Sequence, residues 1–320
     1  MKNMIAVKVL NKIEEAEEIF SFELGREDGA PLPPFTAGAH IDVVTPNGAI
    51  RQYSLCNNPQ DSSHYLIGVM RDPNSRGGSR SMVDEVQVGD TLNISEPRNH
   101  FPLVPAERSI LFGGGIGITP VLCMAERLHT IGADFELHYC VRSQNRAAFL
   151  ERMKSSPFAD RVFLHLDDGP EEQKLNPVAL LANPAPTTHL YICGPTGFMN
   201  WVIDTAKQQG WSEPTIHREY FAAEEIDTSG DESFQIQIAS TGQVFTVEKD
   251  QCATDVLAAN GFPIDVSCSE GICGTCLTKV LSGDIEHRDM FLMDSEREAN
   301  DQFTPCVSRG KPGTTIVVDL

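Results

Sequence analysis

Four cysteines near the C-terminus constrain the fold of this chain more than any other feature. They form the pattern C-x4-C-x2-C-x29-C, made of Cys268, Cys273, Cys276 and Cys306. This spacing is typical of a loop that holds a [2Fe–2S] cluster with four thiolates. Gly271 and Gly274 lie inside the loop, where a tight wrap around a small cluster leaves little room for side chains. The sequence therefore predicts an iron–sulfur centre in this part of the chain.

Two other interpretations of the cysteines are open at this point. The four residues could be structural cysteines packed in a core, or they could bind zinc. Zinc sites usually carry a C-x2-C pair at both ends, whereas one end here is the single Cys306. The spacing favours the cluster, and backbone N–H groups freed by the wrapped loop can donate hydrogen bonds to its sulfurs.

The composition is that of an acidic globular protein. The 320 residues are 41% hydrophobic and 22% charged, with a formal net charge of −20 and nine cysteines. Such a charge repels nucleic-acid backbones and anionic membranes. The longest apolar stretch, 110–125, is interrupted by glycines and a proline, which a membrane helix rarely tolerates. We expect no nucleic-acid or membrane partner, a cytoplasmic location and reduced thiols.

The distribution of residue types divides the chain into three segments. Residues 1–105 contain short alternating runs separated by turn residues, which predicts an antiparallel β-barrel. Residues 106–228 alternate between strand-like and helix-like runs, which predicts a parallel sheet with helices on both faces. An acidic, apolar-poor stretch at 222–233 is typical of a linker. Residues 229–320 begin with a hairpin pattern and then hold the cysteine loop.

Two polar motifs mark the first segment. Arg51-Gln52-Tyr53-Ser54 ends a strand-like run, and Arg76-Gly77-Gly78-Ser79 opens a short helix-like run. A helix N-terminus with an arginine beside it can bind an anion such as a phosphate group. Each motif alone also fits an ordinary strand or a glycine turn, so their order and spacing carry the argument.

Two glycine-containing turns mark the second segment. Gly113-Gly114-Gly115-Ile116-Gly117-Ile118-Thr119-Pro120 follows a strand-like run and opens a helix, as in a turn whose backbone approaches a pyrophosphate. It departs from the dinucleotide fingerprint G-x-G-x-x-G, and alone it also fits an ordinary strand–helix turn. Cys193-Gly194-Pro195 ends a later strand-like run, where a buried structural cysteine is the alternative. Both turns are candidate nucleotide-binding loops.

Taken in order, the segments resemble the phthalate dioxygenase reductase family, and residues 229–320 resemble a plant-type ferredoxin. The resemblance covers essentially the whole chain. It implies an FMN-binding antiparallel β-barrel at 1–105, an NAD-binding α/β domain at 106–228 and an α+β β-grasp ferredoxin domain at 229–320. It also implies a function: the reductase component of a multicomponent Rieske-type aromatic oxygenase or O-demethylase. Such a chain passes electrons from NADH through FMN and a [2Fe–2S] cluster to the terminal oxygenase.

The resemblance also implies roles for individual residues. Ser54 would donate a hydrogen bond near flavin N5, and the Cys193 thiol would lie near the nicotinamide carbon that gives up hydride. Arg51 would pair with the flavin phosphate. Tyr53 would pack on the flavin, and Phe221 would cover one face of its ring. The other residues implied to bind flavin or nucleotide are Gln52, Gly68, Val69, Met70, Arg76, Gly77, Gly78, Ser79, Gly114, Gly115, Gly117, Thr119, Gly194 and Pro195.

Some of these choices rest on the family alone. FMN rather than FAD is one of them. Arg142 and Ser143 follow the second strand-like run of the second segment, where an adenosine ribose would lie, and there they could bind the 2′-phosphate of NADPH. Because members of the family mostly use NADH, we prefer NADH. The acceptor is also open, since the same chemistry would serve a non-aromatic Rieske oxygenase or a cytochrome P450.

The distribution of charge suggests how the acceptor is recognised. Residues 229–320 hold 15 acids and 6 bases, so −9 of the net charge of −20 lies on them. We expect this acidic segment to meet a basic docking patch on a terminal oxygenase. We expect the chain itself to be monomeric.

Overall fold

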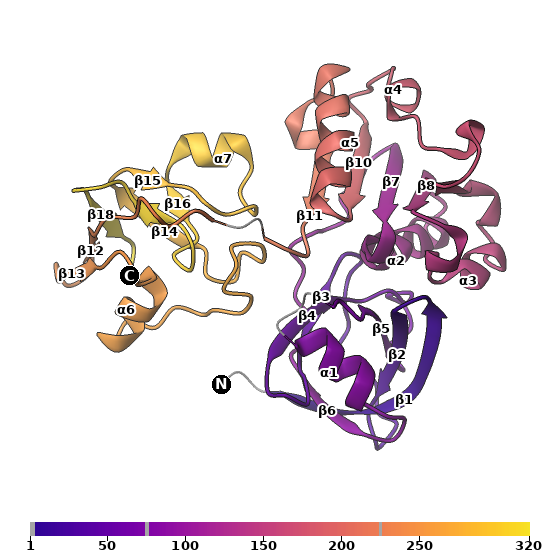
Figure 1. Cartoon of the computed structure of the whole chain (residues 1–320), viewed down its shortest axis with the longest axis horizontal. Helices are drawn as coiled ribbons and strands as arrows, with labels where there is room; N and C mark the ends of the chain where they lie inside the picture. Colours follow the sequence, from indigo (N-terminus) through magenta and orange to yellow (C-terminus); the bar gives the residue numbers. More distant parts are fainter. Residues whose placement is uncertain (1–3, 74–76, 224–225) are drawn as a thin grey trace. The chain divides into compact units, whose positions relative to one another are not determined.

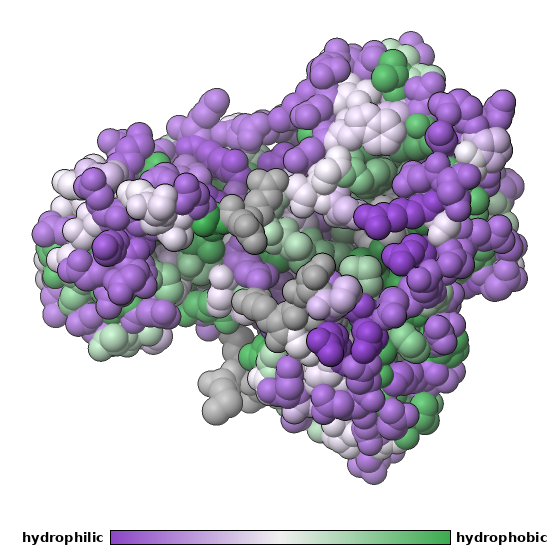
Figure 2. All heavy atoms as spheres, viewed as in Figure 1, coloured by the Kyte–Doolittle hydropathy of each residue, from purple (hydrophilic) through white to green (hydrophobic). Residues whose placement is uncertain are grey.

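The computed structural model describes residues 4–73, 77–223 and 226–320. The chain forms two compact units, residues 1–221 and residues 222–320 (Figure 1). On the face shown in Figure 2, both units present mostly hydrophilic side chains with small apolar groups among them. Among the described residues, no helix is both long enough and apolar enough to cross a membrane.

The first part of unit 1 is an antiparallel six-stranded barrel in the order β4-β3-β6-β1-β2-β5. An antiparallel bridge between Leu55 and Ile67 joins the end of β4 to β5 and closes the barrel. The helix α1 (Gly78–Glu85) lies between β5 and β6 in the chain. The strands are β1 (Ile5–Ala16), β2 (Ile19–Gly25), β3 (His40–Val44), β4 (Ile50–Ser54), β5 (Tyr65–Met70) and β6 (Thr91–Ile94).

The second part of unit 1 is a parallel five-stranded sheet in the order β11-β10-β7-β8-β9. The chain leaves β7 in one direction and returns to β10 on its other side. The carboxyl ends of β7 and β10 therefore form a switch point, where open α/β sheets bind ligands. The strands are β7 (Arg108–Gly114), β8 (Asp134–Val141), β9 (Val162–Leu166), β10 (Thr188–Cys193) and β11 (Ile216–Glu219).

Helices cover both faces of the parallel sheet. Alternate residues of β7 point to opposite faces, so Phe112 packs with the core of α5 and Leu111 packs with the core of α2. In Figure 1, α2 lies between the sheet and the barrel. The helices are α2 (Ile118–Thr130), α3 (Leu150–Lys154), α4 (Pro177–Leu180) and α5 (Thr196–Gln208).

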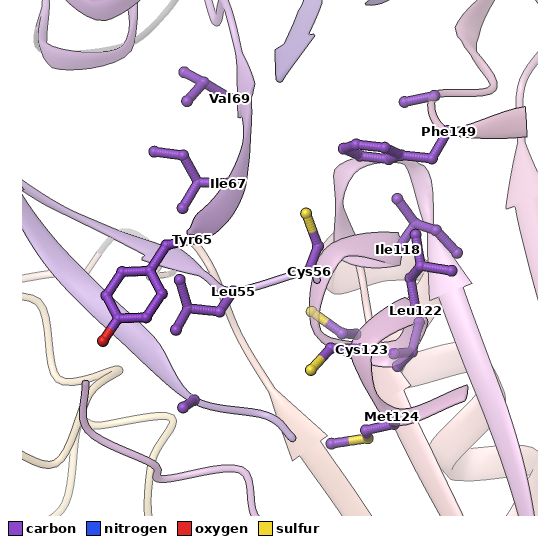
Figure 3. Close-up of a cluster of buried hydrophobic side chains, with 14 of the residues drawn as sticks. Leu55, Cys56, Tyr65, Ile67, Val69, Ile118, Leu122, Cys123, Met124 and Phe149 are labelled. Atoms are coloured by element: carbon purple, nitrogen blue, oxygen red, sulfur yellow. The ribbon is translucent and has the colours of Figure 1, made fainter. Parts of the chain in front are cut away.

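One hydrophobic core joins the barrel to the parallel sheet. Figure 3 shows Ile67 and Val69 of β5 on one side and Ile118 and Leu122 of α2 on the other, and all four side chains are fully buried. Because the two parts share this core, unit 1 is one body. The expected boundary between residues 105 and 106 stays a prediction.

Unit 2 is a β-grasp with a core of its own. Its sheet has the order β13-β12-β18-β14-β16, with β12 and β18 parallel. Phe234, Leu257 and Ile316 are buried in the core, Leu257 from α6. The expected combination of barrel, parallel sheet and β-grasp is confirmed. The elements of this unit are β12 (Phe234–Ile238), β13 (Val244–Val247), α6 (Ala253–Ala259), β14 (Thr278–Ser282), β15 (Ile285–Glu286), α7 (Asp294–Ala299), β16 (Gln302–Phe303), β17 (Arg309–Gly310) and β18 (Thr315–Val318).

Candidate functional site

The end of β4 brings the barrel against the carboxyl end of the parallel sheet. Ser54 is buried there, and its hydroxyl Oγ donates a hydrogen bond to Oε2 of Glu219 at 3.1 Å. In the sheet, Glu219 of β11 pairs with Cys193 of β10, and Cys193 pairs with Gly113 of β7. The Ser54 hydroxyl, the Glu219 carboxyl and the Cys193 thiol therefore lie at the same edge of the parallel sheet.

Burial sets the protonation state of these groups. Desolvation by the surrounding protein raises the pKa of the partly buried Glu219 to about 8, so the carboxyl carries a proton at neutral pH. Burial, together with the nearby Glu219, raises the pKa of the Cys193 thiol well above its ordinary value. This edge therefore presents a neutral acid and a neutral thiol.

Sequence reasoning missed Glu219. Near the end of the second segment it singled out only Phe221, which is 38% exposed. The one signal available was an acid at the carboxyl end of a strand, and such acids are usually solvated. Only the packing of the barrel onto the sheet buries it.

The start of α1 forms an anion cradle with Arg51. Gly77 precedes α1 with φ 92° and ψ −17°, a left-handed conformation suited to glycine. A Cβ atom on Gly78 would lie 2.7 Å from Arg51 Nε, so the guanidinium lies directly across the helix start. Backbone N–H groups and a cation meet there, as a phosphate group requires. Ser79 is in the first turn of α1, and Arg76 lies outside the described residues.

The other residues expected to bind flavin differ in their surroundings. The Tyr53 hydroxyl is buried and has no hydrogen-bond partner among the described residues, so a bound group could satisfy it. Gln52, by contrast, donates to Asp42 Oδ1 at 3.3 Å inside the barrel. The side chain of Val69 points into the shared core, whereas Met70 is exposed.

Gly68 of β5 lies against α2. A Cβ atom there would come within 2.7 Å of Thr119 Cγ2, so only glycine lets the strand pass this close. The Thr119 hydroxyl donates to the Ile116 carbonyl at 3.1 Å. The threonine thus closes the turn before α2 and contacts the barrel strand through its methyl group.

The two glycine-containing turns touch each other at the switch point. A Cβ on Gly117 would lie 2.3 Å from the Cys193 carbonyl oxygen, and one on Gly194 would lie 2.9 Å from Gly114 Cα. Gly115 has a positive φ of 53°. Such close backbone packing excludes side chains, as in a turn whose backbone approaches a pyrophosphate. Pro195 follows directly and precedes α5.

Arg142 lies just beyond β8 and is exposed. Its carbonyl accepts a hydrogen bond from the Asp168 backbone N–H at 3.1 Å. The hydroxyl of the next residue, Ser143, donates to Asn145 Oδ1. This segment therefore continues the carboxyl edge of the sheet toward β9.

The cysteine loop of unit 2 gathers its thiols in two pairs. Cys276 Sγ and Cys306 Sγ lie 3.3 Å apart. In the other pair, the Cys268 thiol hydrogen-bonds Cys273 and lowers the pKa of Cys273. Among the described residues, no three His, Cys, Asp or Glu side chains converge on a single ion. Two thiols for each of two irons is the donor set of a [2Fe–2S] cluster, rather than the four-around-one set of zinc.

The loop also supplies backbone donors. The Glu270 N–H donates to Cys268 Sγ at 3.3 Å, and the Thr275 N–H donates to Cys273 Sγ at 3.5 Å. Gly271 and Gly274 have positive φ values of 71° and 68°. A Cβ on Gly271 would lie 2.5 Å from Val307 Cγ2. The loop therefore fits the group that its spacing predicts.

Comparison with known proteins decides the family. Residues 236–311 match the family model of the 2Fe-2S iron-sulfur cluster binding domain. A vanillate O-demethylase oxidoreductase of Pseudomonas putida is 56% identical over 319 residues, which cover 99% of this chain and 100% of the relative. A solved structure of phthalate dioxygenase reductase is 38% identical, covers 99% of this chain and 98% of its own, and has a TM-score of 0.72.

The chain belongs to the phthalate dioxygenase reductase family. An intact type IV self-sufficient cytochrome P450 monooxygenase also matches 99% of this chain with 41% of its own length, at 35% identity and a TM-score of 0.87. The chain is an oxidoreductase, the reductase component of an oxygenase or demethylase system, and it works with an oxygenase partner. The expected cofactors, FMN, NADH and a [2Fe–2S] cluster, are confirmed with the family.

Proposed function

We propose that this member of the phthalate dioxygenase reductase family serves an aromatic O-demethylase, whose Rieske oxygenase acts on vanillate or a similar methoxybenzoate. The observation that carries the proposal is the 56% identity, over essentially the whole chain, with the vanillate O-demethylase oxidoreductase of Pseudomonas putida. The similarity to a self-sufficient cytochrome P450 keeps a P450 acceptor as the second candidate.

The residues at the carboxyl edge of unit 1 are proposed to hold the flavin and the nicotinamide. Arg51 and the N–H groups at the start of α1 would hold the flavin phosphate, and Tyr53 would pack beside the flavin. The turns at Gly114–Gly117 and Cys193–Pro195 would hold the nucleotide. Support comes from the Arg51–Gly78 approach and from the contact between the two turns. When bound, the flavin accepts hydride from NADH and releases electrons singly.

Three groups of this chain act directly around the reacting atoms. Ser54 orients its hydroxyl through the hydrogen bond to Glu219. Glu219 holds a proton on its buried carboxyl, which keeps a negative charge away from the place where reduction adds one. Cys193 has a neutral thiol that is fully buried. It would lie beside the nicotinamide ring when NADH is bound. None of these groups needs to act as a strong acid or base, because the protein's task is orientation and electrostatics.

The partner surface is proposed to lie on unit 2. The excess of 9 acids over bases on residues 229–320 would attract a basic patch on the oxygenase. We further propose that the reductase is monomeric and cytoplasmic. The five cysteines outside the cluster set form no disulfide, which supports the location, since the cytosol keeps thiols reduced.

The test pairs the purified reductase with purified terminal oxygenases. With NADH and vanillate, we expect turnover with a vanillate oxygenase, measured as formaldehyde released, to exceed turnover with a P450 acceptor by more than about tenfold. Equal or faster turnover with the P450 would contradict the proposal.

A salt titration tests the docking surface in the same assay. Raising ionic strength should slow electron delivery to the oxygenase, because exposed charges are screened over about 8–10 Å. Reduction of a neutral quinone by the same preparation serves as the control and should change little. Delivery that is insensitive to salt would contradict an electrostatic docking surface.

A further inference from the structure

The turn between β1 and β2 lies on the segment that follows β8. Glu17 sits in this turn, and its backbone N–H donates to the Asn145 carbonyl at 2.9 Å. The Asn145 side-chain amide donates to Glu17 Oε2 at 2.6 Å. Arg146 approaches the other carboxylate oxygen, with 3.3 Å between its Nη2 and Glu17 Oε1. A barrel residue thus makes three contacts with two neighbouring residues of the parallel-sheet domain.

The segment that receives these contacts is where adenosine ribose specificity is set. In open α/β sheets, residues just after the second strand lie at the 2′-position of the ribose, and a cation there accommodates a 2′-phosphate. Here the second strand is β8, and its next residues carry two cations, Arg142 and Arg146. Arg146 already has a carboxylate partner in Glu17.

The surrounding charges have the same sign as Glu17. Asp167 and Asp168 follow β9, and their backbone N–H groups donate to the carbonyls of Val141 and Arg142 at 3.0 and 3.1 Å. Both acids are exposed beside the end of β8. A dianionic 2′-phosphate at this edge would meet three carboxylates, and one of the two cations would already be paired.

We propose that Glu17 sets the preference of this reductase for NADH over NADPH, by pairing Arg146 and by adding a negative charge beside the adenosine ribose. The inference rests on the proposed nucleotide site at the switch point. The parallel-sheet domain would bind the nucleotide, and a residue in a turn of the neighbouring barrel would set the choice between NADH and NADPH. The neutral 2′-hydroxyl of NADH meets no such repulsion.

The test measures ligand binding and turnover with the full-length holoprotein. Calorimetry with adenosine 2′,5′-bisphosphate and with 5′-AMP isolates the 2′-phosphate. In Glu17→Gln, affinity for the bisphosphate should rise about tenfold at low salt, as expected for removing a repulsive charge and freeing an arginine. Affinity for 5′-AMP should change less than about twofold, and the ratio of kcat/KM for NADPH to that for NADH should rise in parallel.

Two further variants sharpen the result. Glu18→Gln is the matched control, because Glu18 is the next acid in the same turn but lies 3.5 Å from Arg71 of the barrel. It should leave the bisphosphate affinity unchanged. Adding Arg146→Gln to Glu17→Gln should reduce the gain, since the freed arginine is then absent and only the relief of repulsion by Glu17 remains.

Three outcomes would overturn the inference: no gain in Glu17→Gln, an equal gain in Glu18→Gln, or a gain that is undiminished when Arg146 is also replaced. If 5′-AMP fails to bind even the unmodified protein, the proposed nucleotide site itself is refuted, and this inference with it. Circular dichroism of each variant checks that the fold is retained.

Discussion

Ser54 at the end of a barrel strand and Glu219 at the end of the last strand of the parallel sheet are joined by a hydrogen bond of 3.1 Å. The two residues lie 165 positions apart in the chain. The bond links the proposed flavin side of the site to its nicotinamide side, and its acceptor is a carboxyl group that burial keeps protonated. The protonation of this pair therefore gives the site a measurable dependence on pH.

Flavin reduction by NADH should slow as the pH rises above about 8. Above that pH the buried Glu219 ionises, and its negative charge opposes the negative charge that reduction adds to the flavin. Glu219→Gln keeps a neutral group of similar shape. We expect its rate at pH 7 to stay within about threefold of the unmodified protein, with no alkaline decline, since only the charge is removed. Stopped-flow absorbance between pH 6 and 9.5 measures both. A loss of more than about a hundredfold at pH 7 would instead indicate obligatory proton transfer from the carboxyl.

Stability should depend on the same group. The pKa of Glu219 is 4.5 when unperturbed and about 8 in the folded protein, so the folded state binds the proton more tightly. Its contribution is complete below pH 4.5 and is lost as the pH rises toward 8. Thermal melts should show Glu219→Gln gaining several degrees in Tm relative to the unmodified protein at pH 9, and less at pH 5. A difference in Tm that does not change with pH would contradict the buried, protonated state.

Flavin affinity should respond to Gly78. In Gly78→Ala the new methyl group would press on the Arg51 guanidinium at 2.7 Å and move it from the start of α1. We expect flavin to bind about tenfold more weakly, the size expected for losing one charge-assisted hydrogen bond. Fluorescence titration of the apoprotein with FMN measures this. Gly230→Ala, at a position with open space around its Cβ, is the control and should leave the affinity unchanged.

Cluster retention should respond to Gly271 but much less to Gly313. Both glycines have φ of 71°, so an alanine is strained equally in the backbone at either position. Only at Gly271 is the new methyl group crowded, by Val307 Cγ2 at 2.5 Å, whereas Gly313 has nothing within 4 Å. We expect Gly271→Ala to lose most of its iron and acid-labile sulfide, and cytochrome c reduction to fall about tenfold or more, since the strained loop cannot close around the cluster. NADH-dependent ferricyanide reduction should persist in both variants. Equal iron contents in the two variants would show that crowding at Gly271 does not matter.

Local pattern was enough to predict much of this molecule. Cys268, Cys273 and Cys276 lie in one loop and Cys306 follows at a set distance along the chain, and the glycines of the two nucleotide turns mark positions where backbones touch. Both can be read from neighbouring residues. The alternating runs of the barrel and the strand–helix alternation of the sheet are local in the same sense.

Tertiary packing decided what the pattern did not show. Glu219 looks like any acid at a strand end until the barrel covers it. The helix α3 begins only at Leu150, because Phe149 adopts a left-handed φ of 58° and the Ala148 N–H donates to the Tyr139 hydroxyl at 3.0 Å. The contact between Glu17 and Asn145 joins residues 128 positions apart, beyond the reach of any local signal.

The core that joins the barrel to the parallel sheet has a consequence for how such proteins recombine in evolution. A break near residue 105 would expose Ile67 and Val69 of the barrel and Ile118 and Leu122 of α2. All four side chains are fully buried in the core that the two parts share. A break near residue 221 leaves each resulting piece with its own intact core. Natural exchange of electron-delivery modules between reductases should therefore preserve the flavin and nucleotide parts as an inherited pair, while the iron–sulfur module is gained, lost or moved as a separate cassette.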